Sequence, residues 1–408
     1  MPLSSIVGNI GTMNETVFPT VMTNQIDVDD SIAILEDDRS LFAPWFMKLC
    51  PAKKAAKGMK CEWIEDEVVP VYTTSATTIG AGVTALVVTA GTGNWIKPND
   101  MLYVETTGER LLATAVATDI VTVIRGVGST AAPITAADGI IRLANASPQA
   151  ASYPAIRTTQ PLGAFNLQQI IRTPWAGAKT TISEAIRGEN DVVAFNKMKT
   201  GLQHAREIEQ SCWFGARNQT TAATSNHGTQ PQLMMGGFLS YITSNTTTVG
   251  GALSQSAFET WLKNQAFATG VPDDKLVVCS PNVAQALSGF ALGKMAYPSP
   301  SISELGSRIM TYVSPTTGVN VKIVVHQDWR QYATGQSGTN FSSNANSPGG
   351  LAVCIDTRYC YLKGFRWTQF LDERQNPGDD AQVFELLTEA TLVVKQQKNF
   401  ALLRGVTG

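Results

Sequence analysis

The sequence is poor in charge and has no apolar run long enough to span a membrane. Only 16% of its 408 residues are charged, against a usual share of about 25%. Its 31 basic and 33 acidic residues leave a net charge of −2, which excludes a globally basic nucleic-acid-binding protein and a long polyanionic tail. No stretch approaches the ~20 apolar residues that cross a bilayer. A hydrophobic share of 43% nevertheless predicts folded domains with cores.

Signals for secretion and for disulfide bonding are also missing. The first residues, MPLSSIVGNIGTMNETVFPT, contain neither the basic nor the apolar region of a signal peptide. We therefore expect the protein to stay in the reducing cytoplasm in which it is made. The cysteines form no C-x-x-C pair, and we expect buried free thiols at Cys50, Cys61, Cys212, Cys279, Cys354 and Cys360.

Motifs for catalysis or ligand binding are scarce. There is no G-x-S-x-G elbow and no H-E-x-x-H pair. GFALGKM resembles a phosphate loop but is one residue short and lacks Ser or Thr after Lys294. The histidines are predicted to be structural, with His204 solvated on the polar face of a helix, His326 hydrogen-bonded at a sheet edge, and His227 in a neutral loop. We expect no enzyme, no cofactor and no metal site.

Long tracts without charge are the most unusual feature that the sequence does contain. No charged residue lies at 68–96, 218–258 or 331–355, and these tracts are rich in Thr, Ser, Asn, Gly and Ala. A free soluble monomer usually covers its surface with mixed charge, whereas interface cores are depleted in charge. The tracts are therefore either surface loops or surfaces that meet other protein.

Residues 1–59 form a Pro-interrupted, irregular arm. Its acidic cluster around Asp27 to Asp38 does not fit the spacing of a calcium loop, so a solvated or partner-facing arm is the better interpretation. An apolar group in the arm needs a surface to bury against, either its own core or a neighbouring subunit. Four of its members are Leu41, Phe42, Trp45 and Phe46, and the fifth is Leu49.

The remaining chain predicts an α+β protein. Residues 76–146 contain β-branched runs between turn signals, which predict a small all-β barrel or sandwich of four to six strands. Apolar residues recur every three or four positions from Met198 to Cys212, which predicts an amphipathic helix that ends at Gly215. Residues 238–330 alternate helix and strand. A capping box at Ser256 and Glu259 predicts one helix start, and Ser280 followed by Pro281 predicts another. The end of the chain predicts a long strand.

Taken in order, these segments resemble the major capsid proteins of tailed bacteriophages with the HK97-type fold, in a subfamily with a β-rich insertion in the extended loop. The likeness covers most of the chain from about residue 30. The segments that carry it are KCEWIEDEVVP, NDMLYVETTGERLLATAV with IVTVIRGVGSTAAP, FNLQQIIRTPWAGAKTTIS, EIEQSCWFGARN, LMMGGFLSYI and NPGDDAQVFELLTEATLVVKQQKNFALLRGV.

The resemblance implies a domain plan. It comprises an N-terminal arm (1–59), an extended loop (60–76 and 146–164), an inserted β-barrel-like module (77–145), a peripheral domain with a long spine helix (165–235 and 358–408) and an axial domain (236–357). It also implies a non-enzymatic shell protein that self-assembles into hexamers and pentamers of an icosahedral head around double-stranded DNA. No lysine of the extended loop matches the crosslinking role known in some relatives.

The implied partners are further copies of the chain, a separate scaffolding protein, a portal and a decoration protein. The resemblance also implies non-specific proximity to packaged DNA and no membrane partner. The chain would reside in the virion capsid, and in the host cytoplasm during assembly. The predicted inter-subunit contacts are the apolar arm residues Leu41, Phe42, Trp45 and Phe46 together with Trp63, Glu65, Asp66, Arg374, Asp379 and Asp380. Two alternative functions remain, an encapsulin-like compartment shell and a β-rich glycan-binding virion protein. An enzyme ranks behind both as an interpretation of the sequence.

Overall fold

The computed structural model describes residues 55–149, 153–183, 192–220, 231–269, 275–290, 295–296, 309–329 and 347–407. The chain divides into two compact units, a smaller one of residues 62–164 and a larger one of residues 1–61 with 165–408. We call the smaller unit the β module. Two strands, β1 (Lys60–Glu65) and β8 (Leu162–Leu167), pair as the chain enters and leaves it.

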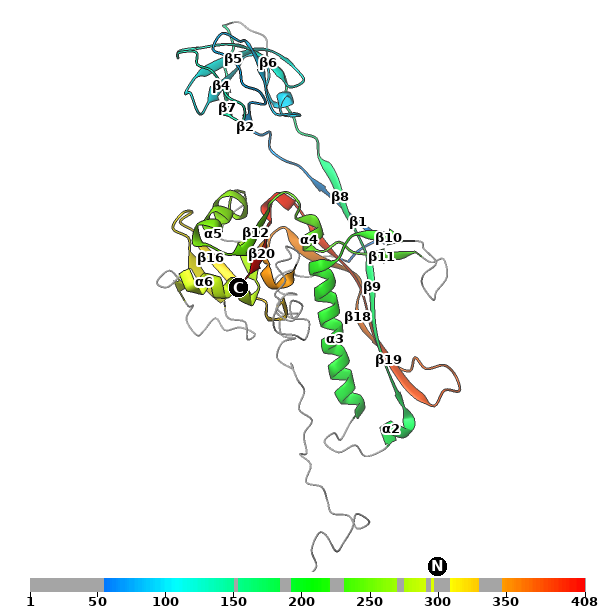
Figure 1. Cartoon of the computed structure of the whole chain (residues 1–408). Helices are drawn as coiled ribbons and strands as arrows, with labels where there is room; N and C mark the ends of the chain where they lie inside the picture. Colours follow the sequence, from blue (N-terminus) through cyan, green and yellow to red (C-terminus); the bar gives the residue numbers. More distant parts are fainter. Residues whose placement is uncertain are drawn as a thin grey trace, which may run out of the picture. The chain divides into compact units, whose positions relative to one another are not determined.

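The β module is a six-stranded antiparallel sheet in the order β2-β7-β4-β5-β6-β3 (Figure 1). A bridge between Ser75, after β2, and Val88, after β3, joins the two ends of this order and closes the sheet. Side chains that alternate along each strand fill the interior. The strands are β2 (Tyr72–Thr74), β3 (Ala85–Val87), β4 (Asp100–Val104), β5 (Arg110–Ala117), β6 (Ile120–Ile124) and β7 (Gly139–Asn145), with a 3-10 turn, η3 (Gly93–Trp95). The predicted all-β insertion is confirmed.

A buried ion pair ties the loops of the β module together. Arg125 Nη2 lies 2.8 Å from Glu109 Oε2, and both side chains are almost fully buried. The amide groups of Gly126 and Ala132 also donate to the Glu109 carboxylate. Burial by itself would raise the pKa of Glu109, but these hydrogen bonds outweigh it and lower the pKa below its ordinary 4.5.

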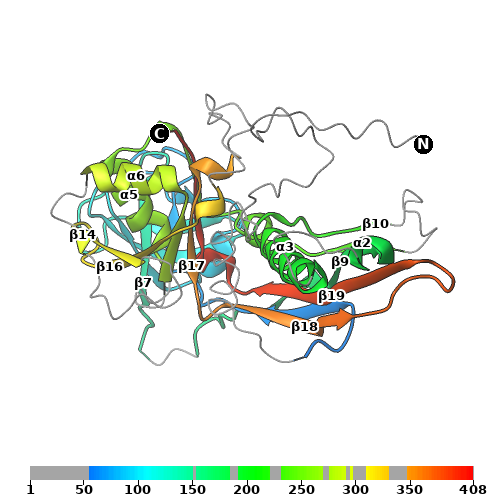
Figure 2. The ribbon, with the colours of Figure 1, turned by 90° about the horizontal axis from the view of Figure 1, so that it is seen from below.

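In the larger unit, one long helix lies against a three-stranded antiparallel sheet (Figure 2). The sheet order is β18-β19-β9. These elements are β9 (Gln169–Ala178), β18 (Cys360–Leu371), β19 (Ala381–Val394) and α3 (Val192–Phe214). The helix ends one residue before Gly215, and β19 is the long strand expected near the end of the chain. A short helix, α2 (Lys179–Ser183), follows β9, and β10 (Asn218–Thr220) pairs with β11 (Gln232–Met234).

The larger unit also contains a seven-stranded mixed sheet in the order β12-β20-β17-β13-β16-β15-β14. Its strands are β12 (Thr246–Ala252), β13 (Lys275–Cys279), β14 (Met295–Ala296), β15 (Ile309–Val313), β16 (Asn320–Val325), β17 (Ala352–Asp356) and β20 (Ala401–Thr407). The helical elements are α4 (Phe238–Tyr241), α5 (Gln255–Trp261), a π-helical turn η4 (Leu262–Ala266), α6 (Pro281–Phe290), and 3-10 turns η9 (Pro348–Gly350) and η10 (Gln397–Asn399).

After Lys275, the central strand β13 is apolar from Leu276 to Cys279 because both faces of this sheet are covered. Leu276 and Val278 belong to a core shared with the end of α3, whereas Val277 and Cys279 belong to a second core beneath α5 and α6. A strand buried on both sides reads as a continuous hydrophobic run instead of an alternating one. Burial raises the pKa of the Cys279 thiol to about 12.

The helix starts of this region follow the prediction only in part. Ser280 caps α6 with Pro281 at the first helical position, as predicted, and its Oγ accepts from the Val283 amide. For α5 the prediction is wrong, because the N-cap is Ser254, whose Oγ accepts from the Ala257 amide at 3.2 Å. Capping requires extended backbone at the cap, and Ser256 already lies inside the helix.

The cysteines, membrane-spanning helices and metal-binding groups can be checked within the described residues. Cys61, Cys212, Cys279, Cys354 and Cys360 are buried free thiols, as predicted, and Cys50 lies outside the described residues. Within the described ranges we find no helix with the length and hydropathy to cross a membrane. The same ranges contain no group of three or more His, Cys, Asp or Glu side chains suited to a metal ion.

Candidate assembly surfaces

Segments far apart in the sequence meet at Asn166, a buried residue near the end of β8. Its Nδ2 donates to the carbonyl groups of Gly236, at 2.9 Å, and Leu392, at 2.6 Å. Its Oδ1 accepts from the amides of Gly236 and Leu167, each at 2.8 Å. One side chain thus joins β8, the loop before α4, and β19. Asn166 was not identified from the sequence. Its position as a polar residue between Phe165 and Leu167 could have indicated a buried hydrogen-bonding side chain.

Close packing at the end of α3 supports the same junction. The Gly237 amide donates to the Gly215 carbonyl at 2.7 Å. A Cβ atom on Gly237 would lie only 2.7 Å from the Cys212 carbonyl oxygen, so glycine is required where this loop crosses the helix end.

One face of the β18-β19-β9 sheet carries arginines above buried carboxylates. Arg172 Nη2 lies 2.6 Å from Glu385 Oε2, and Arg366 Nε lies 2.8 Å from Glu389 Oε2. The carboxylates are buried, while the arginine side chains are about half exposed. The predicted contact residue Arg374 joins this face, with its Nε 3.9 Å from Glu385 Oε1. Buried carboxylates need charged partners, so the arginines are held in place with part of each guanidinium facing solvent.

The turn between β18 and β19 carries the predicted contact residues Asp379 and Asp380. Asn376 Nδ2 donates to Asp379 Oδ2 at 3.1 Å, and the Asp379 amide donates to the Asn376 carbonyl at 3.1 Å. Asp380 Oδ1 lies 4.0 Å from Lys179 Nζ. Gly378 adopts a positive φ of 95°, which glycine tolerates without strain. The turn is organised by its own hydrogen bonds, and both carboxylates are exposed.

The opposite face of this sheet meets α3 through His204, which is buried and not solvated as the sequence predicted. His204 Nδ1 lies 2.8 Å from Thr173 Oγ1, and Nε2 lies 2.7 Å from Thr388 Oγ1. Burial lowers the pKa of His204, partly opposed by Glu207. The prediction was wrong because helical spacing does not reveal that the sheet covers this part of the helix.

His326 is also buried and not at a sheet edge. It follows β16, and its Nε2 lies 2.6 Å from Glu209 Oε1 on α3. Its ring stacks on Trp329 with 4.9 Å between centroids. Trp213 donates from Nε1 to the same Glu209 oxygen at 3.3 Å. His326 does form the predicted hydrogen bond, but the bond connects α3 to the seven-stranded sheet.

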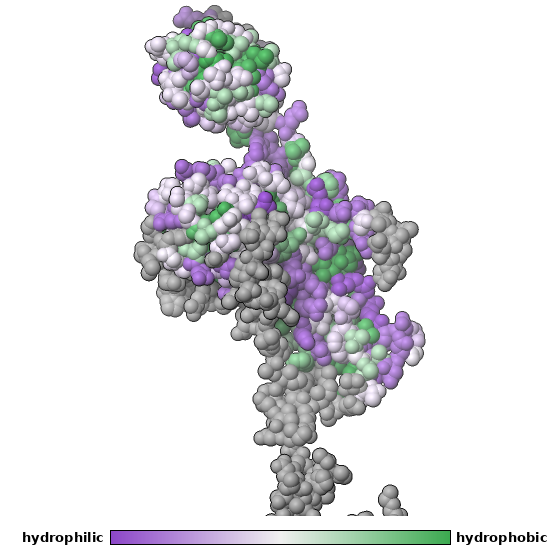
Figure 3. All heavy atoms as spheres, viewed as in Figure 1, coloured by the Kyte–Doolittle hydropathy of each residue, from purple (hydrophilic) through white to green (hydrophobic). Residues whose placement is uncertain are grey.

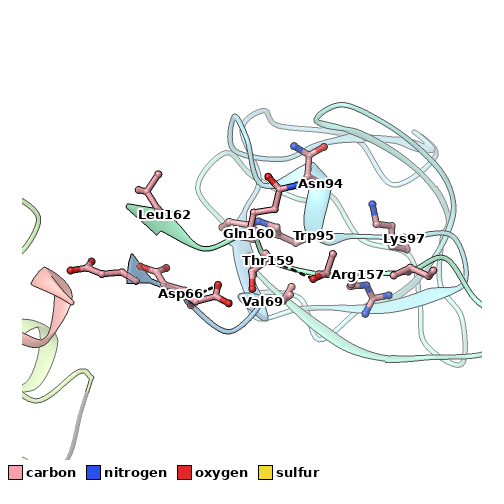
Figure 4. Close-up of a pocket in the computed structure, with 13 residues that line it drawn as sticks. Asp66, Val69, Asn94, Trp95, Lys97, Arg157, Thr159, Gln160 and Leu162 are labelled. Carbon is pink, nitrogen blue, oxygen red and sulfur yellow. Dashed lines mark hydrogen bonds between the residues drawn. The ribbon is translucent and has the colours of Figure 1, made fainter. Parts of the chain in front are cut away.

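The segments that lead into and out of the β module contain the other predicted contact residues. Trp63 is buried in β1, and its Nε1 donates to Glu65 Oε1 at 2.6 Å. Glu65 and Asp66 line a cavity of about 650 Å³, whose other wall includes Lys97 and Arg157 (Figure 4). Arg157 forms an ion pair with the buried Asp100. The cavity is open and mixed in charge.

These two segments, residues 62–71 and 153–162, expose large apolar side chains. The exposed fractions are 74% for Ile64, 92% for Val68, 77% for Ile156 and 75% for Leu162. Sequence reasoning did not name them, although Ile64 has the opposite strand parity to Cys61 and Trp63 and so points to the other face of β1. The apolar arm residues Leu41, Phe42, Trp45 and Phe46 lie outside the described residues.

A comparison with protein-family models matches residues 10–407 to the SU10 major capsid protein family. The chain belongs to this family. Membership confirms the predicted function, a major capsid protein of a tailed bacteriophage, and the predicted α+β capsid fold. A comparison with curated proteins finds no match.

Three solved structures are similar to this SU10-family chain at low sequence identity. The capsid of Myoviridae phage XM1 matches at 9% identity and a TM-score of 0.48, covering 98% of this chain and 100% of that chain. The capsid of a native GTA particle matches at 10% identity and a TM-score of 0.46, covering 94% and 95%. A structure named Mycobacterium phage Ogopogo matches at 11% identity and a TM-score of 0.43, covering 88% of this chain and 90% of that chain. Family membership rests on the family model alone.

Proposed function

We propose that the chain self-assembles into hexamers and pentamers of an icosahedral head that encloses double-stranded DNA. The observation that carries this proposal is the set of exposed apolar side chains on residues 62–71 and 153–162. Covering apolar side chains that are exposed to water in the lone chain stabilises an assembly by roughly 25 cal/mol for each Å2 of apolar surface that is buried. A capsid supplies such neighbours, since every subunit touches several others.

The domain plan implied by the resemblance assigns a role to each part. In this proposal the extended loop (60–76 and 146–164) and the arm (1–59) lie on neighbouring subunits. Glu65 and Asp66 contact those subunits, and Trp63, which is buried in β1, orients Glu65 through its hydrogen bond. The inserted module (77–145) projects from the shell. The peripheral domain (165–235 and 358–408) and the axial domain (236–357) form the capsomer body.

Further partners complete the proposal. A separate scaffolding protein and a portal take part in assembly in the host cytoplasm, and a decoration protein is a partner of the finished shell. The net charge of −2 suits a lining that meets packaged DNA without binding it tightly. The chain has no catalytic role in this scheme.

The experiment that tests the proposal places a charge on the extended loop. Val68→Asp should leave the unfolding transition unchanged, because Val68 is 92% exposed, yet reduce particle yield about tenfold, since a buried unpaired carboxylate costs several kcal/mol at an interface. Val313→Asp is the matched control at an exposed valine of β15 and should assemble normally. Electron microscopy and size-exclusion chromatography give the readout. Wild-type chain that stays monomeric with its scaffold supplied would overturn the proposal.

A second contact is proposed at the turn that contains Arg374, Asp379 and Asp380, near a local threefold axis. Its exposed carboxylates are available for a cationic partner on a neighbouring subunit. Reversal of both charges, Asp379→Lys with Asp380→Lys, should lower particle yield without changing the fold. Unaltered assembly would count against this contact.

A further inference from the structure

The outer face of one half of the β module is apolar and uncharged. Strand β6 alternates strictly, so that Val121 and Val123 enter the module core while Ile120, Thr122 and Ile124 point outward. The exposed fractions of Ile120 and Ile124 are 48% and 51%. Side chains this large are not needed by the core, which is complete without them.

The neighbouring strands extend this face. Thr122 lies opposite Ala85 of β3 and Ala115 of β5, and Ile120 lies opposite Val87. Residues paired across antiparallel strands share a face, so these side chains form rows across the three strands. We call them the β5-β6-β3 face. Figure 3 shows hydrophobic atoms gathered over β5 and β6 on the visible side of the module.

Charged residues lie at the borders of this face and not within it. Arg110 begins β5, and Asp119 occupies the turn between β5 and β6. The other half of the sheet differs, since β7 carries Arg142, and Glu105 follows β4 directly. The absence of charge between the borders makes the face suited to a partner surface that is itself uncharged.

We propose that the β5-β6-β3 face packs against the same face of a second copy of the chain in the assembled shell. The inference rests on the proposed shell assembly. A neutral surface can meet its own copy without like-charge repulsion, and a twofold contact uses one patch twice. Two sheets that present small and β-branched side chains pack face to face at a spacing of about 10 Å.

The size of the face favours a second copy over a separate soluble protein. The two half-exposed isoleucines, Ile120 and Ile124, offer on the order of 200 Å2, well below the ~800 Å2 per partner of a stable interface. A soluble partner would not be retained by so small a contact. A copy held nearby by other contacts in the same shell is retained, because tethering raises its effective concentration.

A charge placed at the centre of the face tests the contact. Ala115 and Ala144 are both exposed alanines of the module, on β5 and β7. Ala115→Lys should increase the rate of particle dissociation in denaturant about tenfold, because each contact would bring two ammonium groups together. The matched control Ala144→Lys should dissociate as the wild type does. Equal rates for both variants would overturn the proposal.

Crosslinking identifies the occupant. Thr122 lies at the centre of the face, where it would approach its own counterpart across the twofold axis. Oxidised Thr122→Cys particles should give a covalent dimer of the chain on a non-reducing gel, whereas Ala144→Cys particles should give monomer. Monomer from Thr122→Cys, or a crosslink to a different protein, would overturn the proposal. Failure of the wild type to form particles would instead reject the proposed function.

Discussion

At the scale of single residues, the structure depends on a few buried polar side chains that bind backbone groups. Asn166 makes four such hydrogen bonds and bridges three segments. Asn166→Ala leaves buried backbone groups without partners and should lower the free energy of unfolding by about 3 kcal/mol. Urea denaturation measures this loss. The exposed Asn218 in β10 is the control, and Asn218→Ala should change stability by less than about 0.5 kcal/mol.

His204 gives the larger unit a specific dependence on pH. Its pKa in the folded chain is lowered below 6.5 by burial, so the unfolded chain takes up a proton first as pH falls. The free energy of unfolding should therefore decrease below about pH 6.5, by at most about 1.4 kcal/mol per pH unit for this group.

The variant His204→Gln removes the titrating ring while keeping hydrogen-bonding groups for the two threonines. Denaturation between pH 5 and pH 7 should give a shallower slope for the variant than for the wild type. Identical slopes would show that His204 takes up its proton equally in the folded and unfolded chain.

At the scale of elements, the start of α5 distinguishes the observed cap from the predicted one. Ser254 Oγ accepts from the Ala257 amide, whereas Ser256 is exposed inside the helix. Ser254→Ala should destabilise the chain by about 1 kcal/mol, and Ser256→Ala by less than about 0.5 kcal/mol. Thermal unfolding of the two serine variants compares them directly. A larger effect at Ser256 would favour the cap predicted from sequence.

The sequence predicted helices and strands correctly where a short stretch of residues carries the hydrophobic pattern by itself. The β-branched runs of the β module and the three-to-four-residue spacing in α3 give the correct element because neighbouring side chains alone set these patterns. Burial of His204 was not predictable, since it depends on strands that return from residues 169–178 and 381–394 to cover the helix. Burial of His326 was not predictable either, since it depends on contact with Glu209 of α3 and with Trp329. Periodicity identifies a face but not what covers it.

At the scale of the whole molecule, the division into two compact units predicts two unfolding transitions. Glu109→Gln breaks the buried pair with Arg125 and should lower the transition of the β module by about 3 to 5 kcal/mol. Asn166→Ala should lower the transition of the larger unit instead. Differential scanning calorimetry of both variants assigns the transitions. A single transition that both variants shift equally would contradict this independence.

Acid should act on the β module through the same ion pair. Because the pKa of Glu109 in the folded chain lies below its ordinary 4.5, the pair contributes stability above that pH. The contribution disappears as pH falls through the lowered pKa. In Glu109→Gln the transition of the module should lose this acid dependence.

The sequence by itself determined the α+β class, the order of the segments and the capsid family, because composition, periodicity and motif order are properties of the linear chain. Only the tertiary structure decided that Asn166 joins β8 to β19, that Glu209 on α3 meets His326, and that Ile120 and Ile124 stand outward on a neutral sheet face. Such contacts join residues widely separated along the chain, and the long-range pairing and packing of strands and helices brings them together.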